Sequence, residues 1–215
     1  MKKALLLMLV LTFALSCGAF AKSLGLPNEL INGSWEFGDD TAWLREGGDI
    51  VDLPSYFGNP GPAPGEVDNF GYGTASSWGV NSGQITQDVY VAPGEYTVDL
   101  SAWICVMDGG VIASWGELQL LVDDQVVDSA RVELAGSGDF ATTGWQYVEI
   151  NWSGFVAGKK SARVVLYADG QGGGNWPWGI VCVDGVDLEE TQGVVPEPAS
   201  LLVLLGGLAA IRRRK

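Results

Sequence analysis

Apolar and polar residues alternate from Tyr96 to Val106, which is the clearest structural signal in the chain. The even-numbered positions are apolar: Tyr96, Val98, Leu100, Ala102, Ile104 and Val106. The odd-numbered positions between them are Thr97, Asp99, Ser101, Trp103 and Cys105. Because successive side chains of a β-strand point to opposite faces of a sheet, the pattern predicts a strand with one face in the core. Trp103 then lies on the opposite, mostly polar face.

Six further segments have the character of strands. They are Ile85–Val91, Glu117–Val122, Val126–Leu134, Trp145–Trp152, Ala162–Ala168 and Ile180–Leu188. Turn residues connect several of them, at Ala92–Glu95, Asp123–Gln125 and Ala157–Lys160. Many short strands with tight turns, and no long amphipathic helix pattern, predict an all-β fold. We expect a jelly-roll type β-sandwich of two antiparallel sheets.

Two segments lack any sustained period. Leu53–Gly83 is rich in Gly, Pro, Asn and Ser, and Gly170–Trp178 is a glycine-rich run that ends in Trp176-Pro177-Trp178. Irregular segments of this length inside a domain usually form functional or wrapping loops. We therefore expect loops here, the first with at most one short strand.

The N-terminal residues 1–21 have the features of a signal peptide. Lys2 and Lys3 precede an apolar run, Ala4–Leu15, and Ala19-Phe20-Ala21 is a small-x-small cleavage site. This predicts an N-terminal signal helix that is removed after Ala21 during export. Acylation of Cys17 in a lipoprotein signal is an alternative, although Ala14-Leu15-Ser16 fits that pattern poorly.

The C-terminal residues 194–215 predict a membrane anchor. Pro196-Glu197-Pro198 is followed by an uncharged apolar run, Leu201–Ile211, and then by Arg212, Arg213, Arg214 and Lys215. As a helix, Ala199–Ile211 would be about 20 Å long, a short transmembrane helix whose basic end stays on the cytoplasmic side.

This series closely resembles the PEP-CTERM sorting signal of exopolysaccharide-producing Gram-negative bacteria. The resemblance implies recognition and removal by an exosortase, a membrane protease. It also implies a precursor that is anchored in the inner membrane, and a processed protein that is located at the cell surface or in the extracellular matrix. The expected organisation is a signal peptide at 1–21, a β-sandwich domain at 22–193 and the sorting signal at 194–215.

Charge and composition exclude several functions. The chain has 12 basic and 26 acidic residues, and 6 of the basic ones (Lys2, Lys3, Arg212–Lys215) lie in the two ends. A body this acidic repels nucleic acid and anionic lipid. Histidine is absent, which excludes Ser-His-Asp and Cys-His catalysis and zinc sites with histidine ligands.

Two cysteines, Cys105 and Cys182, remain once the signal peptide is removed. In an oxidising compartment an even pair favours a disulfide. On the chain-entropy model, closing the loop between them would stabilise the fold by about 4.5 kcal/mol. Two buried free thiols are the alternative.

Several segments of the body resemble, in order, the galactose-binding-like β-sandwich of many carbohydrate-binding modules. Leu30-Ile31-Asn32-Gly33-Ser34-Trp35-Glu36, with Trp43 after it, is similar to the opening strand of that family. Gly83–Tyr96 looks like its central hairpin, and Ile180–Leu188 resembles its closing strand. The resemblance implies a structural Ca²⁺ that ties the first strand to the last. Glu36 and Asp184 fall on the matching positions.

The chain has nine tryptophans, and those that are exposed are the candidate sugar-binding residues. Trp103 is the first candidate because strand alternation places it opposite the core. Trp176 and Trp178 follow, because a glycine-rich loop can present their rings to solvent. Sugar rings have apolar faces that stack on aromatic rings, although most tryptophans in a domain are buried.

Three functions remain open. The body can be a non-catalytic module that binds extracellular polysaccharide, a structural surface or biofilm-matrix protein with no sugar ligand, or a carboxylate-based glycan hydrolase. The last requires two carboxylates facing each other about 5 to 10 Å apart. The resemblance and the tryptophans favour the first function, without catalysis.

Overall fold

The computed structural model describes residues 29–35, 37–56, 58–66, 69–136, 139–171 and 178–193. These residues form ten strands: β1 (Leu44–Gly47), β2 (Asp49–Asp52), β3 (Phe70–Ser77), β4 (Val80–Tyr90), β5 (Gly94–Asp108), β6 (Ser114–Val122), β7 (Gln125–Leu134), β8 (Ala141–Val156), β9 (Lys159–Asp169) and β10 (Trp178–Gln192). Within these ranges no helix is long and apolar enough to span a membrane. The predicted signal helix and transmembrane helix lie outside the described residues.

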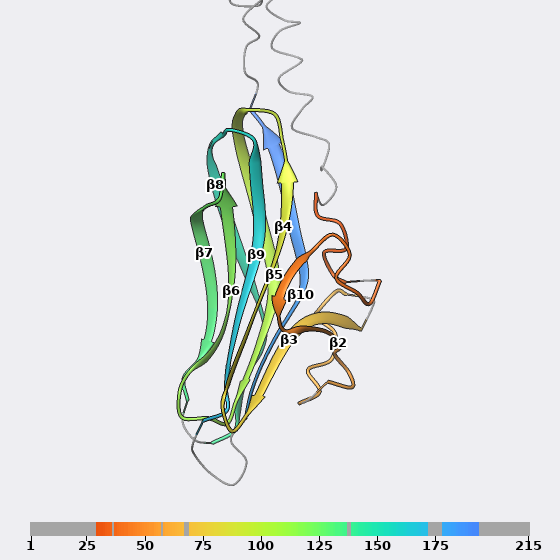
Figure 1. The fold of residues 1–215 in the computed structure, drawn as a ribbon, viewed down its shortest axis with the longest axis vertical. Coiled ribbons are helices and arrows are strands. Elements are labelled where there is room, and N and C mark those ends of the chain that lie inside the picture. The colour runs from red at the N-terminus through yellow and green to blue at the C-terminus, as the bar shows by residue number, and fades with distance from the viewer. Residues whose placement is uncertain are drawn as a thin grey trace, which may run out of the picture.

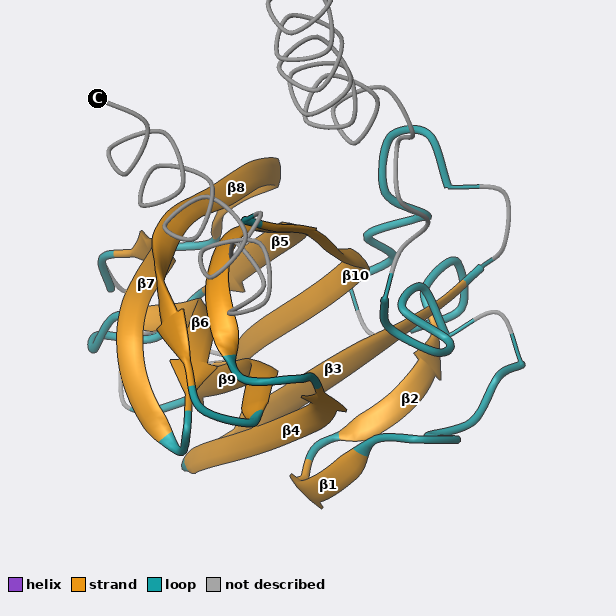
Figure 2. Cartoon of the chain, turned by 90° about the horizontal axis from the view of Figure 1, so that it is seen from above, coloured by secondary structure: helices purple, strands orange, loops and turns teal. Residues whose placement is uncertain are grey.

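The strands form two antiparallel five-stranded sheets that pack face to face. Sheet A has the order β1-β4-β9-β6-β7, and sheet B has the order β2-β3-β10-β5-β8. Figure 1 shows the long strands running side by side, and Figure 2 shows the two layers from above. The prediction of an all-β sandwich of two antiparallel sheets is confirmed.

One apolar layer between the sheets forms the main core. β5 contributes the six even-numbered residues from Tyr96 to Val106, as its alternation predicts, and β9 contributes Ala162, Val164, Leu166 and Ala168. Gly116 on β6 faces the same layer, where an added Cβ would lie 2.7 Å from Ile104 Cγ2. The close approach of β6 to sheet B therefore requires glycine at this position.

The seven predicted strands are all present, with longer bounds. β4 begins five residues before the predicted Ile85, and β8 extends the predicted Trp145–Trp152 at both ends. β1 and β2 were not predicted, because each has only four residues and most of their side chains are exposed. β3 lies inside the segment expected to be a loop with at most one short strand.

The predicted opening strand at Leu30–Glu36 is wrong for the described residues 29–35, which form turns and bends. Asn32 and Trp35 have φ values of 58° and 55°, so the backbone turns instead of extending. The segment still joins the two sheets. Val186 N–H donates to Gly33 O at 3.1 Å, and Gln87 exchanges two hydrogen bonds with the backbone of Ile31, at 2.7 and 2.8 Å.

A buried ion pair crosses the core between the sheets. Lys160 on β9 contacts the carboxylate of Glu190 on β10, and their side chains are 0% and 15% exposed. The ammonium also lies 5.7 Å from the ring centre of Tyr96. Burial lowers the pKa of Lys160 to about 8, and the nearby charge of Glu29 opposes this shift. A buried charge depends on its partner, because removal from water is expensive.

We expect Glu190→Gln to destabilise the fold by about 3 kcal/mol, since it removes the carboxylate that directly contacts the buried Lys160 ammonium. The double variant Lys160→Met/Glu190→Leu should recover most of that loss, because it replaces both charges with apolar groups. Urea unfolding at pH 7 measures both effects. A double variant as unstable as the single one would contradict this account.

Candidate functional site

The outer face of sheet A carries aromatic and polar side chains in cross-strand rows. Strand register aligns, from β4 to β7, Ser82, Tyr167, Trp115 and Glu133 in one row, Gln84, Val165, Glu117 and Arg131 in the next, and Thr86, Arg163, Gln119 and Ser129 in a third. The intervening residues of β9, Val164 and Leu166, are fully buried in the core. Alternation therefore directs these rows away from the core.

Tyr167 and Trp115 form a parallel aromatic pair on this face. Their ring centres lie 5.6 Å apart and their planes differ by 8°. The Arg131 guanidinium lies 4.0 Å from the centre of the Trp115 ring. On the other side of Tyr167, the neighbour on β4 is Ser82, which is small and exposed. The side of the Tyr167 ring toward β4 therefore has room for a ligand, whereas its other side stacks on Trp115.

Charged and amide groups next to this pair form a hydrogen-bonded cluster. Glu117 accepts from Arg131 Nε at 2.6 Å and from Gln119 Nε2 at 2.8 Å. Burial would raise the pKa of Glu117, but the hydrogen bonds from Gln119 and Arg131 outweigh it and lower the pKa below its usual value. The carboxylate is therefore held ionised. This part of the face offers both donors and acceptors to a hydroxyl-rich ligand.

The outer face of sheet B has a different composition. Trp103 on β5 and Tyr147 on β8 are cross-strand neighbours, with ring centres 5.1 Å apart and planes inclined at 57°. Trp103 is half-buried and faces outward, as alternation predicts. Register on β5, β8 and β10 places six carboxylates on this outer face: Glu95, Asp99, Glu149, Asp184, Asp187 and Glu189. The five strands of sheet B contain no lysine or arginine.

A loop covers part of the sheet B face. Leu53 and Tyr56 pack with Cys105, Met107, Ile180 and Cys182 in a second apolar cluster. Trp145 Nε1 donates to Pro60 O at 3.3 Å, which holds the loop down. Trp178 packs against this cluster and lies 4.8 Å from Phe140, ring centre to ring centre. Trp178 therefore has packing contacts on the sandwich, whereas Trp176 lies outside the described residues.

Asp184, the candidate calcium ligand, is fully buried in β10. Its carboxylate accepts from Gly185 N–H at 2.8 Å and from Ala63 N–H at 3.2 Å. It thus joins the covering loop to the bulged part of β10. Glu36 lies outside the described residues, and within those residues no group of three acidic or cysteine side chains is arranged to hold a metal ion.

The structure contains no disulfide between Cys105 and Cys182, and the predicted bridge is corrected in that respect. The two residues lie directly opposite each other on β5 and β10, but both are free and buried. Both belong to the apolar cluster under the loop, where a thiol packs as a small apolar group. Burial raises the pKa of Cys105 to about 11, which keeps this thiol protonated and unreactive.

We expect both thiols to resist alkylation in the folded protein and to react after unfolding, because the loop and the sheet exclude the reagent. Mass spectrometry after iodoacetamide treatment, with and without urea and without reductant, measures this. A product that accepts no label in urea until a reductant is added would show that the bridge exists.

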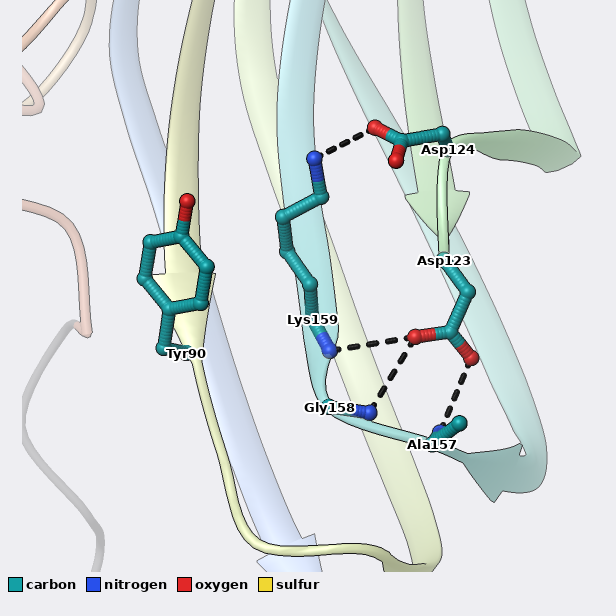
Figure 3. A pocket seen from close by; sticks show the side chains of 6 residues that line it. All are labelled: Tyr90, Asp123, Asp124, Ala157, Gly158 and Lys159. Carbon is teal, nitrogen blue, oxygen red and sulfur yellow. Dashed lines mark hydrogen bonds and ion pairs between the residues drawn. The ribbon is translucent and has the colours of Figure 1, made fainter.

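A hollow at one end of sheet A is built from two turns (Figure 3). It measures about 450 Å³ and is lined by Tyr90, Asp123, Asp124, Ala157, Gly158 and Lys159. Asp123 accepts from three backbone N–H groups, those of Ala157, Gly158 and Lys159, at 2.8 to 3.1 Å. The Lys159 ammonium pairs with Asp88 and Asp124. These contacts join the two turns to each other.

Sequence reasoning missed Trp115 and Tyr167. Trp115 precedes the predicted strand Glu117–Val122, and Tyr167 was counted as a member of the predicted strand Ala162–Ala168. A signal was available, because Ala162, Val164, Leu166 and Ala168 define the core face and place Tyr167 opposite. The pairing of the two rings depends on β6 lying next to β9, which a single sequence does not show.

Comparison with known proteins identifies the fold. No protein-family model matches the chain, and no curated protein matches its sequence. The solved structure of TmCBM61 in complex with β-1,4-galactotriose is similar, with a TM-score of 0.51 and 18% identity, over 78% of this chain and 100% of that one. A family 16 carbohydrate-binding module has a TM-score of 0.40 and 17% identity, over 75% of this chain and 99% of that one. At this TM-score and identity, the likeness to TmCBM61 shows a shared fold.

Proposed function

We propose that the body of this protein is a non-catalytic carbohydrate-binding module whose ligand lies on the outer face of sheet A. The observation that carries this proposal is the Tyr167–Trp115 pair with polar groups of both signs beside it. Aromatic rings bind the apolar faces of sugars, and a few well-placed polar groups fix their orientation. The similarity to TmCBM61, solved with a galactotriose, supports a sugar ligand.

Sheet A suits a neutral sugar better than sheet B does. Sugar hydroxyls both donate and accept hydrogen bonds, and sheet A supplies guanidinium, amide and carboxylate groups together. On sheet B, Asp99, Glu149 and Glu189 are exposed carboxylates on adjacent strands, and no strand of the sheet contains a basic residue. Covering them with a neutral ligand would remove water from several like charges at once, which is costly. Trp103, which was predicted from the sequence and lies beside Tyr147 in the structure, remains the competing platform.

We expect Tyr167→Ala to weaken glycan binding at least tenfold, a loss of about 1.4 kcal/mol, with little change in melting temperature. Trp103→Ala is the matched control, because it removes a half-buried aromatic residue from the outer face of the other sheet. Calorimetric titration with β-1,4-galacto-oligosaccharides, after a screen of soluble and insoluble glycans, gives the affinities. Thermal unfolding shows whether each variant is folded.

Two outcomes would contradict the proposal. Loss of binding in Trp103→Ala, with Tyr167→Ala unchanged, would move the site to sheet B. If no glycan binds the unmutated domain, the protein is better described as a structural surface or matrix protein.

The ends of the chain support a proposal about location. Residues 1–21 and 194–215 have the sequence features of an export signal and of a PEP-CTERM signal for an exosortase. We expect the mature protein to begin near Lys22 and to end near Pro196–Pro198, at the cell surface or in the matrix. Intact-mass measurement of protein from the native host decides this. Retention of Arg212–Lys215 in all of the material would exclude processing.

A structural calcium ion that involves Glu36 and Asp184 is a further proposal, which rests on the sequence resemblance. An ion bound only by the folded state raises the melting temperature. We therefore expect Ca²⁺ to raise it and a chelator to lower it. An unchanged transition under both conditions would rule out the ion.

A further inference from the structure

The basic residues of the described strands all lie in sheet A: Arg45, Arg131, Lys159, Lys160 and Arg163. Sheet B has none, and its outer face carries the six carboxylates named above. The two faces of the sandwich therefore differ strongly in charge. A ligand with negative charges would be repelled by sheet B and could approach sheet A, because unpaired like charges repel over several ångströms.

Four of these five cations already have carboxylate partners. Arg45 pairs with Asp40 and Asp49, and Arg131 pairs with Glu117 and Glu133. Lys159 pairs with Asp88 and Asp124, and Lys160 pairs with Glu190. Their positive charges are thus neutralised within the fold.

Arg163 differs from the other four cations because it has no carboxylate partner among the described residues. Its only contact with a polar group of the described residues is a 3.4 Å hydrogen bond from its Nε to Thr86 Oγ1, and no carboxylate among those residues lies within ion-pair distance. Its neighbours in the cross-strand row, Thr86 and Gln119, are uncharged. The side chain is half-buried on the middle strand of the sheet. A guanidinium has five N–H donors, so most of its hydrogen-bonding capacity is unused.

Arg163 and Tyr167 lie on the same face of β9, four residues apart. At about 3.3 Å per residue, their positions are about 13 Å apart along the strand. A glycan chain that follows β9 can therefore stack one sugar on Tyr167 and bring a later sugar to Arg163. A planar guanidinium matches a carboxylate through two parallel hydrogen bonds.

We propose that Arg163 makes the sheet A site selective for glycans that carry carboxylate groups, namely polysaccharides that contain uronic acids. The inference rests on the proposed function, since it requires a glycan on this face. It adds the chemical class of the ligand and the residue that selects it. Tyr167 supplies the stacking contact common to neutral and acidic chains, and Arg163 supplies the contact that only an acidic chain can complete.

The test uses the mature chain and pairs of matched probes. Each pair is a uronate oligosaccharide and the same oligosaccharide with its carboxyl groups reduced to primary alcohols. We expect the uronate form to bind about 10-fold more tightly or better, the range for a hydrogen bond to a charged group. Arg163→Gln should remove this difference and leave the affinity for the reduced form unchanged. Arg163→Lys should keep part of the difference.

Arg45→Gln is the matched control. It also removes one positive charge from sheet A, but its guanidinium already pairs with Asp40 and Asp49. We expect the preference for the uronate form to survive in this variant, which separates a local contact from a change in net charge. Thermal unfolding confirms that each variant is folded.

The outcomes distinguish the two proposals. If both forms of a probe bind the unmutated protein equally, carbohydrate binding stands and selection by Arg163 is wrong. The same conclusion follows if the preference persists in Arg163→Gln, or if Arg45→Gln removes it equally. If neither form of any pair binds, the proposed function itself fails, and this inference fails with it.

Discussion

Burial of the two inner sheet faces against each other determines which side of every strand remains for function. β5 and β9 show this most clearly, since each places alternate residues in one shared apolar layer. A one-residue slip in register would move the core side chains of a strand to its outer face. The packing of the core therefore also determines which side chains lie in the outer rows. Arg163, Tyr167 and Trp103 are each flanked in sequence by two core residues.

The outer faces of the two sheets differ in loop cover and in charge. Sheet B lies partly beneath a loop that encloses an apolar cluster and both cysteines, and its remaining surface is acidic. All the basic residues of the described strands lie in sheet A. The same sandwich therefore presents one face suited to hydrogen bonding with sugars and another that repels anions. Both the proposed binding site and its selectivity follow from this asymmetry.

The sequence predicted the sandwich well, because strand alternation and turn residues are local signals. It also placed Trp103 outward, since that depends only on the period of two residues in β5. It failed at Leu30–Trp35, where backbone dihedral angles at Asn32 and Trp35 break a strand-like pattern. It favoured a disulfide between Cys105 and Cys182, which the structure shows as two buried free thiols under the covering loop. It missed the Tyr167–Trp115 pair and the isolation of Arg163, because both depend on the order of strands in the sheet.

An NMR titration of isotope-labelled mature protein with a glycan that it binds shows directly whether the ligand lies on sheet A. We expect the largest shift changes at the outward residues of β9 and β6, around Tyr167, Gln119 and Arg163. The residues around Trp103 and Tyr147 should change little. Shift changes that cluster on Trp103, Tyr147 and the acidic rows of sheet B would contradict this location.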